Sequence, residues 1–149
     1  MDKSLIGRKD KIDIPSLSIE NIAVKIDSGA YSSSIHCSSI ELVQTTDGNH
    51  LEVIFLDESN INFTGKVYTF KEYRKKKVKS STGDEQERFF IQLPIVLFEK
   101  EIITDFSLTR RNGLRNPVLL GRKLTSNYFI IDTSMTNVSY KLKKNKINK

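Results

Sequence analysis

Short apolar runs recur along the chain, and most of them are rich in β-branched or aromatic side chains. Polar or glycine-containing segments separate these runs, which is typical of antiparallel β proteins. The pattern predicts strands at residues 22–26, 34–43, 51–56, 61–70, 89–98, 102–108, 118–120 and 128–132.

Two polar segments have the composition of hairpin turns, namely Asp47-Gly48-Asn49 and residues 80–84 around Gly83. Both contain residues that tolerate positive φ or bond their own backbone. One short helix is predicted after Gly121, over residues 122–127, with Leu124 facing inward. We therefore predict a mainly β fold, built as a closed or folded-over barrel with one short helix near the C-terminal end.

The length of 149 residues fits a single domain with its own hydrophobic core. No repeat of fixed period and no low-complexity linker divides the chain, so we expect one domain over residues 1–149. A hydrophobic content of 38% and a charged content of 28% are those of a globular protein. The lysine-rich tail from about Lys141 is expected to be frayed.

No stretch is long and apolar enough to act as a signal peptide or a membrane span, so we expect a cytoplasmic protein that does not contact membranes. Cys37 is the one cysteine, which excludes an intramolecular disulfide and suits a small buried residue. The histidines are His36 and His50, and no His-Glu-x-x-His helix occurs. We therefore expect no metal site, and His36 to be structural.

The net charge of +6 is unevenly distributed. The tail from Lys141 to Lys149 carries five lysines and no acid, so the rest of the chain has a net charge of only +1. A second cluster, KEYRKKKVK at residues 71–79, lies inside the fold. Lysines on an exposed strand deter edge-to-edge pairing, but they also attract acidic ligands, and both interpretations stay open.

The segment VKIDSGAYSSSIH is the most informative of the chain, because an apolar strand ends there at Asp27 and runs into Ser28-Gly29. Glycine permits a tight turn, which holds the carboxylate at the surface of a rigid scaffold, and Ser28 offers a hydroxyl to it. Asp-Ser-Gly by itself is also an ordinary turn. A second segment, NPVLLGRKL at residues 116–124, adds an apolar pair, Gly121 and the predicted helix.

The two segments together resemble the retroviral-type aspartic proteases, and the whole chain resembles the bacterial retropepsin-like aspartic endopeptidases. That family is also described as ATP-dependent zinc proteases and is often found beside ATP-grasp glutamate ligases. The matching pieces are Ile6-Gly7-Arg8, Lys25 to Ala30, Ile35-His36, Val78 to Ser81, Gly83 with Glu85 and Arg88, and Pro117 to Arg122. The departures are Ser28, where threonine is commoner, and Tyr31, where the family usually has a basic residue.

The resemblance implies a six-stranded acid-protease barrel and an aspartic endopeptidase in which Asp27 activates water, supported by Ser28 and Gly29. The expected substrate-binding residues are Lys25, Ala30, Arg74, Lys79, Ser80, Arg88 and Arg122. No cofactor is expected, and no G-x-x-x-x-G-K-S/T phosphate loop occurs in this sequence. The basic residues and the glutamate-ligase context together favour acidic or glutamate-tailed peptides as substrates.

Aspartic proteolysis needs two carboxylates that share a proton, and this chain has one Asp-Ser-Gly turn. A homodimer that pairs two copies of Asp27 is the simplest solution. The alternatives are a monomer in which Asp27 works with Asp132, Lys25 or the lysine cluster, and an inactive relative that only binds peptides.

A rival interpretation is a non-catalytic β-barrel module that binds acidic peptides or nucleic acid through residues 71–79 and the tail. Such a module would lose affinity steeply with salt and would be indifferent to Asp27→Asn. Phe89 and Phe90 are adjacent in a predicted strand and so point to opposite faces, which does not favour a base-stacking platform. Nucleic acid is therefore the less favoured ligand.

Overall fold

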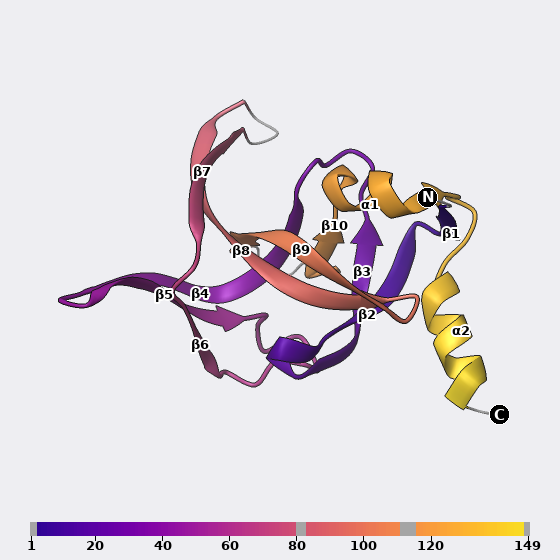
Figure 1. The fold of residues 1–149 in the computed structure, drawn as a ribbon, viewed down its shortest axis with the longest axis horizontal. Coiled ribbons are helices and arrows are strands. Elements are labelled where there is room, and N and C mark those ends of the chain that lie inside the picture. Colours follow the sequence, from indigo (N-terminus) through magenta and orange to yellow (C-terminus); the bar gives the residue numbers. More distant parts are fainter. Residues whose placement is uncertain (1–2, 80–82, 111–115, 148–149) are drawn as a thin grey trace.

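The computed structural model describes residues 3–79, 83–110 and 116–147, and most of them lie in β-strands (Figure 1). The strands are β1 (Ser4–Ile6), β2 (Lys9–Ile14), β3 (Ile19–Ile26), β4 (Ser33–Thr45), β5 (Gly48–Phe55), β6 (Val67–Phe70), β7 (Arg74–Lys79), β8 (Glu85–Leu97), β9 (Lys100–Thr109), β10 (Val118–Leu120) and β11 (Phe129–Ile131). The helices are a 3-10 turn at Pro15–Leu17, α1 (Arg122–Tyr128) and α2 (Val138–Ile147). The mainly β prediction is confirmed.

The main sheet runs in the order β10-β3-β2-β8-β9-β4-β5-β6, with β7 paired to β8 and β10 also paired to β4. The pairings therefore lead round a ring of six strands, from β10 through β3, β2, β8, β9 and β4 and back to β10. One link is thin, because β2 and β8 share a single residue pair, Asp13 with Val96. The mainly β ring is observed, whereas the closed six-stranded barrel stays a prediction.

Strand β10 lies between β3 and β4. It pairs in parallel with β3, Leu120 opposite Ile26, and antiparallel with β4, Val118 opposite Ile35. The segment that joins β3 to β4 consequently passes the end of β10, where Gly121 begins the turn into α1. This arrangement brings the two segments singled out in the sequence together.

Two long strands each serve two partners. The first part of β4 pairs with β9 and the second with β5, while the first part of β8 pairs with β7 and the second with β9. The hairpins β4–β5 and β7–β8 therefore extend away from the body of the molecule (Figure 1). The predicted turn at Asp47-Gly48-Asn49 is confirmed, and Gly48 has a φ of 121° that only glycine adopts easily.

The core is aliphatic, because alternate residues of the strands point inward. In β3, for example, Ile22, Val24 and Ile26 are buried while Ala23 and Lys25 are exposed. The largest fully buried side chains are Phe106, Ile6, Ile12, Ile14, Ile22, Ile35, Leu51, Leu56, Ile91, Ile95, Leu97 and Leu120. The buried core residues Ile26 and Leu120 flank the start of the Asp27 turn, the first in sequence and the second through the hydrogen bond of its carbonyl to the Asp27 N–H.

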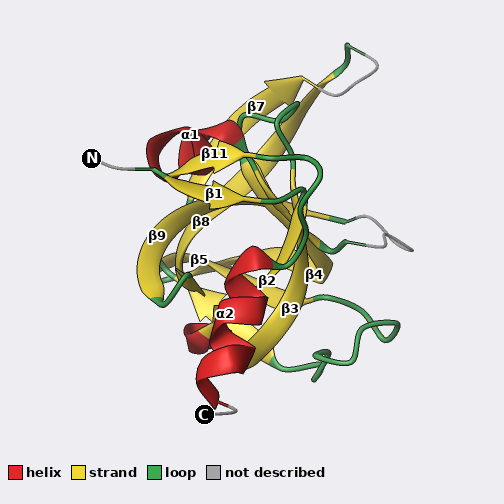
Figure 2. Cartoon of the chain, turned by 90° about the vertical axis from the view of Figure 1, so that its right-hand side faces the viewer, coloured by secondary structure: helices red, strands yellow, loops and turns green. Residues whose placement is uncertain are grey.

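The prediction of a single helix is wrong, because the tail expected to be frayed forms α2 as far as Ile147. The buried carboxylate of Asp10 accepts the backbone N–H groups of Ser139 at 3.0 Å and Tyr140 at 3.1 Å, which are otherwise unsatisfied at a helix start. Lys143 then binds Asp13 at 2.9 Å, and α2 lies along β2 (Figure 2). Asp10 and Asp13 lie near the N-terminus, so the sequence of the tail itself does not indicate the contacts that stabilise α2.

The strand predicted at 61–70 is only partly formed, and its first half is a turn region before β6. The backbone N–H of Asn62 bonds Asn60 Oδ1 at 2.8 Å, and Gly65 has a φ of 74°. Ile61 is 98% exposed, so it contributes nothing to the core. Asparagine bonding to the local backbone outweighs the apolar pattern here. Within the described residues, no helix is long and apolar enough to cross a membrane.

Candidate active site

Asp27 directly follows β3, at the point where the chain turns over the end of β10. Its backbone N–H bonds the Leu120 carbonyl at 2.9 Å, and its own carbonyl accepts the N–H of Ala30 at 3.2 Å. The carboxylate Oδ1 accepts the N–H of Gly29 at 3.0 Å. The side chain is half-buried, whereas Ser28 and Gly29 are exposed. The carboxylate is thus fixed by its own turn and remains open to solvent on one side.

The need for glycine at position 29 comes from contact and not from backbone strain. A Cβ built on Gly29 would lie 3.3 Å from Asp27 Oδ1, tighter than an ordinary contact, and Gly29 does not have a positive φ. The expectation that glycine permits a special turn conformation is therefore replaced by a need for space beside the carboxylate. The N–H of Gly29, rather than the hydroxyl of Ser28, donates the observed bond to Asp27.

The start of α1 braces this turn from behind. The backbone N–H groups of Arg122 and Lys123 bond the carbonyls of Ala30 at 2.8 Å and Tyr31 at 2.9 Å. The Arg122 guanidinium also donates to the Ser28 carbonyl at 2.9 Å. Because these bonds leave the helix and end on the turn, they satisfy N–H groups at the helix start and fix the turn together.

Gly121 allows this close approach. A Cβ there would lie 2.5 Å from the Tyr31 carbonyl oxygen and 2.6 Å from that of Ser32, distances that real Cβ atoms do not show. The N–H of Gly121 donates to the Ser33 hydroxyl at 3.1 Å. Sequence reasoning found Gly121 but missed Ser33, whose residue type gave no signal among many serines.

The β7–β8 hairpin carries the basic cluster on two different faces. Residues directly opposite each other in an antiparallel pair share a face, and neighbours along a strand alternate. On one face Lys76 lies opposite Arg88, and Arg74 lies opposite the buried Phe90. We call Arg74, Lys76 and Arg88 the inner cationic face, because Arg74 turns from it toward the body of the molecule.

The other face of the hairpin is largely neutralised. Lys77 lies opposite Glu87 and Lys79 lies opposite Glu85, so each lysine has an acid across the ladder. Lys75 reaches the same Glu87 diagonally, with 3.1 Å between Nζ and Oε2. Lys79 is therefore placed on the opposite face from Arg74 and Arg88. Ser80, the remaining residue predicted in this hairpin, lies outside the described residues.

Asp105 of β9 binds two cations from different elements, and sequence reasoning missed it. Its Oδ2 accepts bonds from the Arg74 guanidinium and from Lys123 Nζ, the latter at 3.0 Å. Burial alone would raise the pKa of Asp105, but the hydrogen bonds and charges of Arg74 and Lys123 outweigh it and hold the pKa below its ordinary value. The one available signal was an acid inside the predicted strand 102–108.

Among the described residues, neither Asp132 nor Lys25 forms a hydrogen bond or an ion pair with the Asp27 carboxylate, whose bond is to Gly29. Asp132 holds its own turn, since its Oδ1 accepts the Ser134 hydroxyl at 2.6 Å and the Ser134 N–H at 2.9 Å. These bonds, the hydroxyl first, lower the pKa of Asp132. Lys25 lies on the exposed face of β3, between Lys9 of β2 and Leu119 of β10.

The histidines are engaged with neighbouring acids. His36 is buried with its Nε2 2.8 Å from Asp57 Oδ2, and His50 Nε2 lies 3.7 Å from Glu52. Across residues 3–79, 83–110 and 116–147, no three His, Cys, Asp or Glu side chains are grouped so that they could hold a metal ion. The residues described therefore do not fit the zinc label attached to the family. Cys37 is buried, and burial raises the pKa of its thiol, which keeps the thiol protonated.

The ring of strands and the braced turn between β3 and β4 define a mainly β protein, and the class to which it belongs comes from the family comparison. The family model described as retropepsin-like aspartic endopeptidase RimB matches residues 5–141, and the chain belongs to this RimB-like family. The resemblance predicted from the sequence is thereby confirmed.

The curated relatives are named as ligases, whereas the family model is described as an endopeptidase. A probable alpha-L-glutamate ligase of Desulfotalea psychrophila is 30% identical over 134 residues, and one of Shewanella pealeana is 27% identical over 144 residues. Each alignment covers 89% of this chain but only 29% of the relative, so the chain spans less than a third of those proteins. They are consistent with the association between this family and glutamate ligases.

A solved structure supports the fold. A crystal structure of a Legionella pneumophila protein of unknown function matches with a TM-score of 0.71 and 24% sequence identity. The match covers 93% of this chain and 99% of the other, so the same architecture extends over nearly the full length of both.

Proposed function

We propose that this protein is an aspartic endopeptidase that hydrolyses peptide bonds with water activated by Asp27. The observation that carries the proposal is the braced turn, in which Asp27 is half-buried, bonded by Gly29 and fixed from behind by α1. The family match over residues 5–141 supports the same chemistry. We further propose that the six-stranded ring acts as the closed barrel of an acid protease.

The reaction needs a second carboxylate, and we propose that a homodimer supplies it as the same residue of a second copy. One Asp27 carboxylate takes a proton from water while the water oxygen bonds to the substrate carbonyl carbon. The protonated carboxyl of the other copy donates its proton to the carbonyl oxygen. The exposure of Ser28, Gly29 and Tyr31, the last at 59%, supports close approach of two such turns.

We propose acidic or glutamate-tailed peptides as substrates. The inner cationic face of the hairpin supports this choice, because Lys76 has another cation, Arg88, directly across the ladder, whereas the opposite face is neutralised by Glu85 and Glu87. Relatives named glutamate ligases fit the same substrate class, since a ligase of that kind would produce what this peptidase trims. A functional link to an ATP-grasp ligase in the cytoplasm follows from this proposal.

The test is cleavage of a glutamate-tailed peptide and a neutral peptide by wild type and Asp27→Asn, with the molecular mass in solution recorded for both. The proposal expects cleavage of the acidic peptide, loss of cleavage in the variant, and a dimeric mass. Equal cleavage of both peptides at moderate salt would reject acidic peptides as the preferred substrate class, while the proposed peptidase activity would stand.

The inner cationic face also favours a second candidate, a non-catalytic module that binds acidic peptides. The same experiment separates the two. If neither protein cleaves, and both bind the acidic peptide in a salt-sensitive manner, the module is the better description.

A further inference from the structure

Asp105 is an acid whose side chain is largely buried, and its interactions join β9 to β7 and α1. It lies on β9 opposite Gln92 of β8, and its side chain is only 8% exposed. Both of its cationic partners, Arg74 and Lys123, reach the same oxygen, Oδ2. Among the described residues no hydrogen-bond donor reaches Oδ1, which is itself buried. The compensation of this buried charge therefore depends on the two cations.

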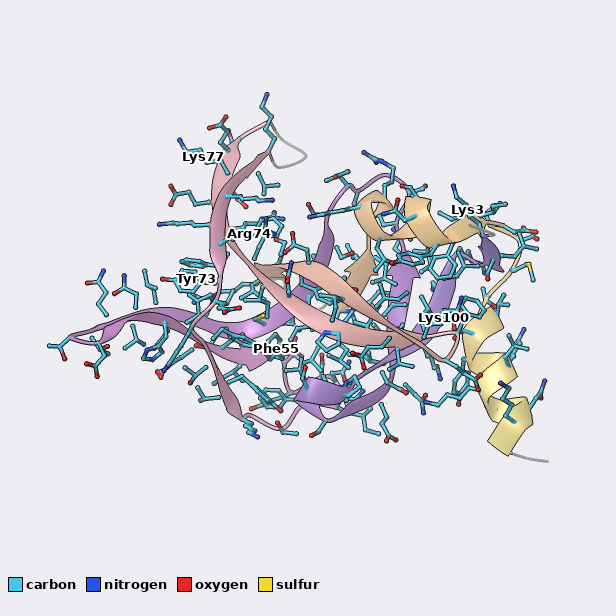
Figure 3. All side chains as sticks on the ribbon, viewed as in Figure 1. Lys3, Phe55, Tyr73, Arg74, Lys77 and Lys100 are labelled. Carbon is cyan, nitrogen blue, oxygen red and sulfur yellow. The ribbon has the colours of Figure 1, made fainter. Side chains whose placement is uncertain are left out.

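The two cations belong to different elements, β7 and α1, and α1 is the helix that braces the Asp27 turn. Arg74 is the first residue of β7, at the point where the hairpin leaves the body of the molecule, with Lys77 farther toward the tip (Figure 3). Lys123 is the second residue of α1, next to Arg122, whose guanidinium holds the Ser28 carbonyl. One carboxylate thus connects the base of the hairpin to the helix that braces the Asp27 turn.

Burial gives this contact more weight than a surface ion pair. The side chains of Lys75 and Glu87 in the same hairpin are 51% and 55% exposed, so water and salt screen their attraction. Asp105 has lost most of its water, and removing a partner from a buried charge leaves that charge uncompensated. Arg74 and Lys123 are 46% and 45% exposed, so each is free to return to water when the contact breaks.

We propose that Asp105 is a positioning residue, which fixes the β7–β8 hairpin relative to α1 and so sets where the inner cationic face lies with respect to Asp27. The effect of Asp105 on substrate binding rests on the proposed peptidase function. Its effect on the position of the hairpin is independent of that function. The two parts can be tested separately, because the position of the hairpin is measurable without any substrate.

The experiment compares wild type, Asp105→Asn and the control Glu87→Gln, which breaks an exposed ion pair on the other face of the same hairpin. Spin labels at Lys77→Cys and Asn127→Cys report the distance between hairpin and α1, while buried Cys37 stays unlabelled. Steady-state kinetics on a glutamate-tailed peptide give KM and kcat for the unlabelled proteins.

We expect Asp105→Asn to broaden the distance distribution and to raise KM about tenfold with kcat nearly unchanged, as for the loss of a charge-assisted contact that positions the binding face. Glu87→Gln should match wild type in both measurements. An unchanged distance distribution in Asp105→Asn overturns the proposal whatever the activity, and a changed distance with unchanged KM overturns its link to the substrate.

Failure of the proposed function gives a different result. If wild type cleaves no peptide while Asp105→Asn still broadens the distribution, the peptidase is rejected and the positioning role stands. Should Asp105→Asn fail to fold, Arg74→Gln and Lys123→Gln test the same contact from its exposed ends. Each is expected to broaden the distribution, and wild-type distances in both variants would overturn the proposal.

Discussion

Gly121 and Tyr31 are packed so closely that a Cβ on Gly121 would lie 2.5 Å from the Tyr31 carbonyl oxygen. The atoms that an added Cβ would meet are backbone atoms of Tyr31 and Ser32, which cannot rotate out of the way as a side chain can. Gly121→Ala is therefore expected to destabilise the protein by about 1–3 kcal/mol, as overpacking of a rigid interior does. Urea unfolding measures the loss.

Gly29→Ala provides the comparison for this prediction. The added methyl would meet only Asp27 Oδ1, a side-chain atom at 3.3 Å, so its cost in stability should be smaller than that of Gly121→Ala. Equal losses for the two variants would contradict the account of Gly121 as a backbone contact.

Removing the Asp10 carboxylate is expected to release α2. Asp10→Ala leaves the N–H groups of Ser139 and Tyr140 without their buried acceptor, at an expected cost of about 1–3 kcal/mol. Hydrogen exchange of the α2 amides should accelerate more than that of β8. Asp13→Asn, which affects the half-buried pair with Lys143, should have a smaller effect, and the reverse order would contradict the capping role.

Asp57 should contribute to acid sensitivity. Its pKa is lowered first by the Ser59 hydroxyl and then by the Ser59 N–H, with the neighbouring His36 adding to the effect. Because the folded pKa lies below the unfolded value of about 3.9, the ionised group stabilises the protein above that pH. This contribution disappears as the pH falls through the folded pKa.

The measurement is the urea midpoint from pH 6 down to pH 3 for wild type, Asp57→Asn and Ser59→Ala. Asp57→Asn should flatten the acidic decline, and Ser59→Ala should flatten it in part. An acidic slope identical in wild type and Asp57→Asn would exclude this contribution.

Lys76 and Lys77 form a natural matched pair, because the same side chain stands at adjacent positions on opposite faces. Lys76 lies opposite Arg88, and Lys77 lies opposite Glu87. Lys76→Gln should raise KM for an acidic peptide about fivefold and weaken its salt dependence, since the variant loses a positive charge that lies opposite another cation. Lys77→Gln should change KM much less. Equal effects would mean that the two faces do not differ in substrate attraction.

The central strands could be predicted from the sequence because their apolar runs are buried whatever their partners are. The bounds expected for residues 118–120 are those of β10, and α1 follows Gly121 as predicted. Strand β2 was missed because Asp10 occupies an inward position of its alternating pattern, where an apolar residue is expected. The burial of Asp10 is explained by its hydrogen bonds to the start of α2, which lies at the other end of the sequence.

The location of the candidate site could also be predicted, whereas the tertiary contacts of the elements around it could not. Asp27 and Gly121 carry local signals, a strand end and a glycine before a helix. The contact of Asp105 with Arg74 and Lys123 joins residues 31 and 18 positions apart, and only tertiary packing brings them together. The separation of the lysine cluster into two faces likewise required the register of β7 against β8.

Residues 27–32 connect two strands that do not pair with each other but with the same third strand, β10. The connection must therefore span two strand spacings, about 10 Å, and no more. The hairpin tips face no such requirement and tolerate insertions, since their ends meet at any length. Sequence length in this family should thus vary at the tips of β4–β5 and β7–β8 and stay constant between Asp27 and Ser33, because one added residue there would move the carboxylate off its support.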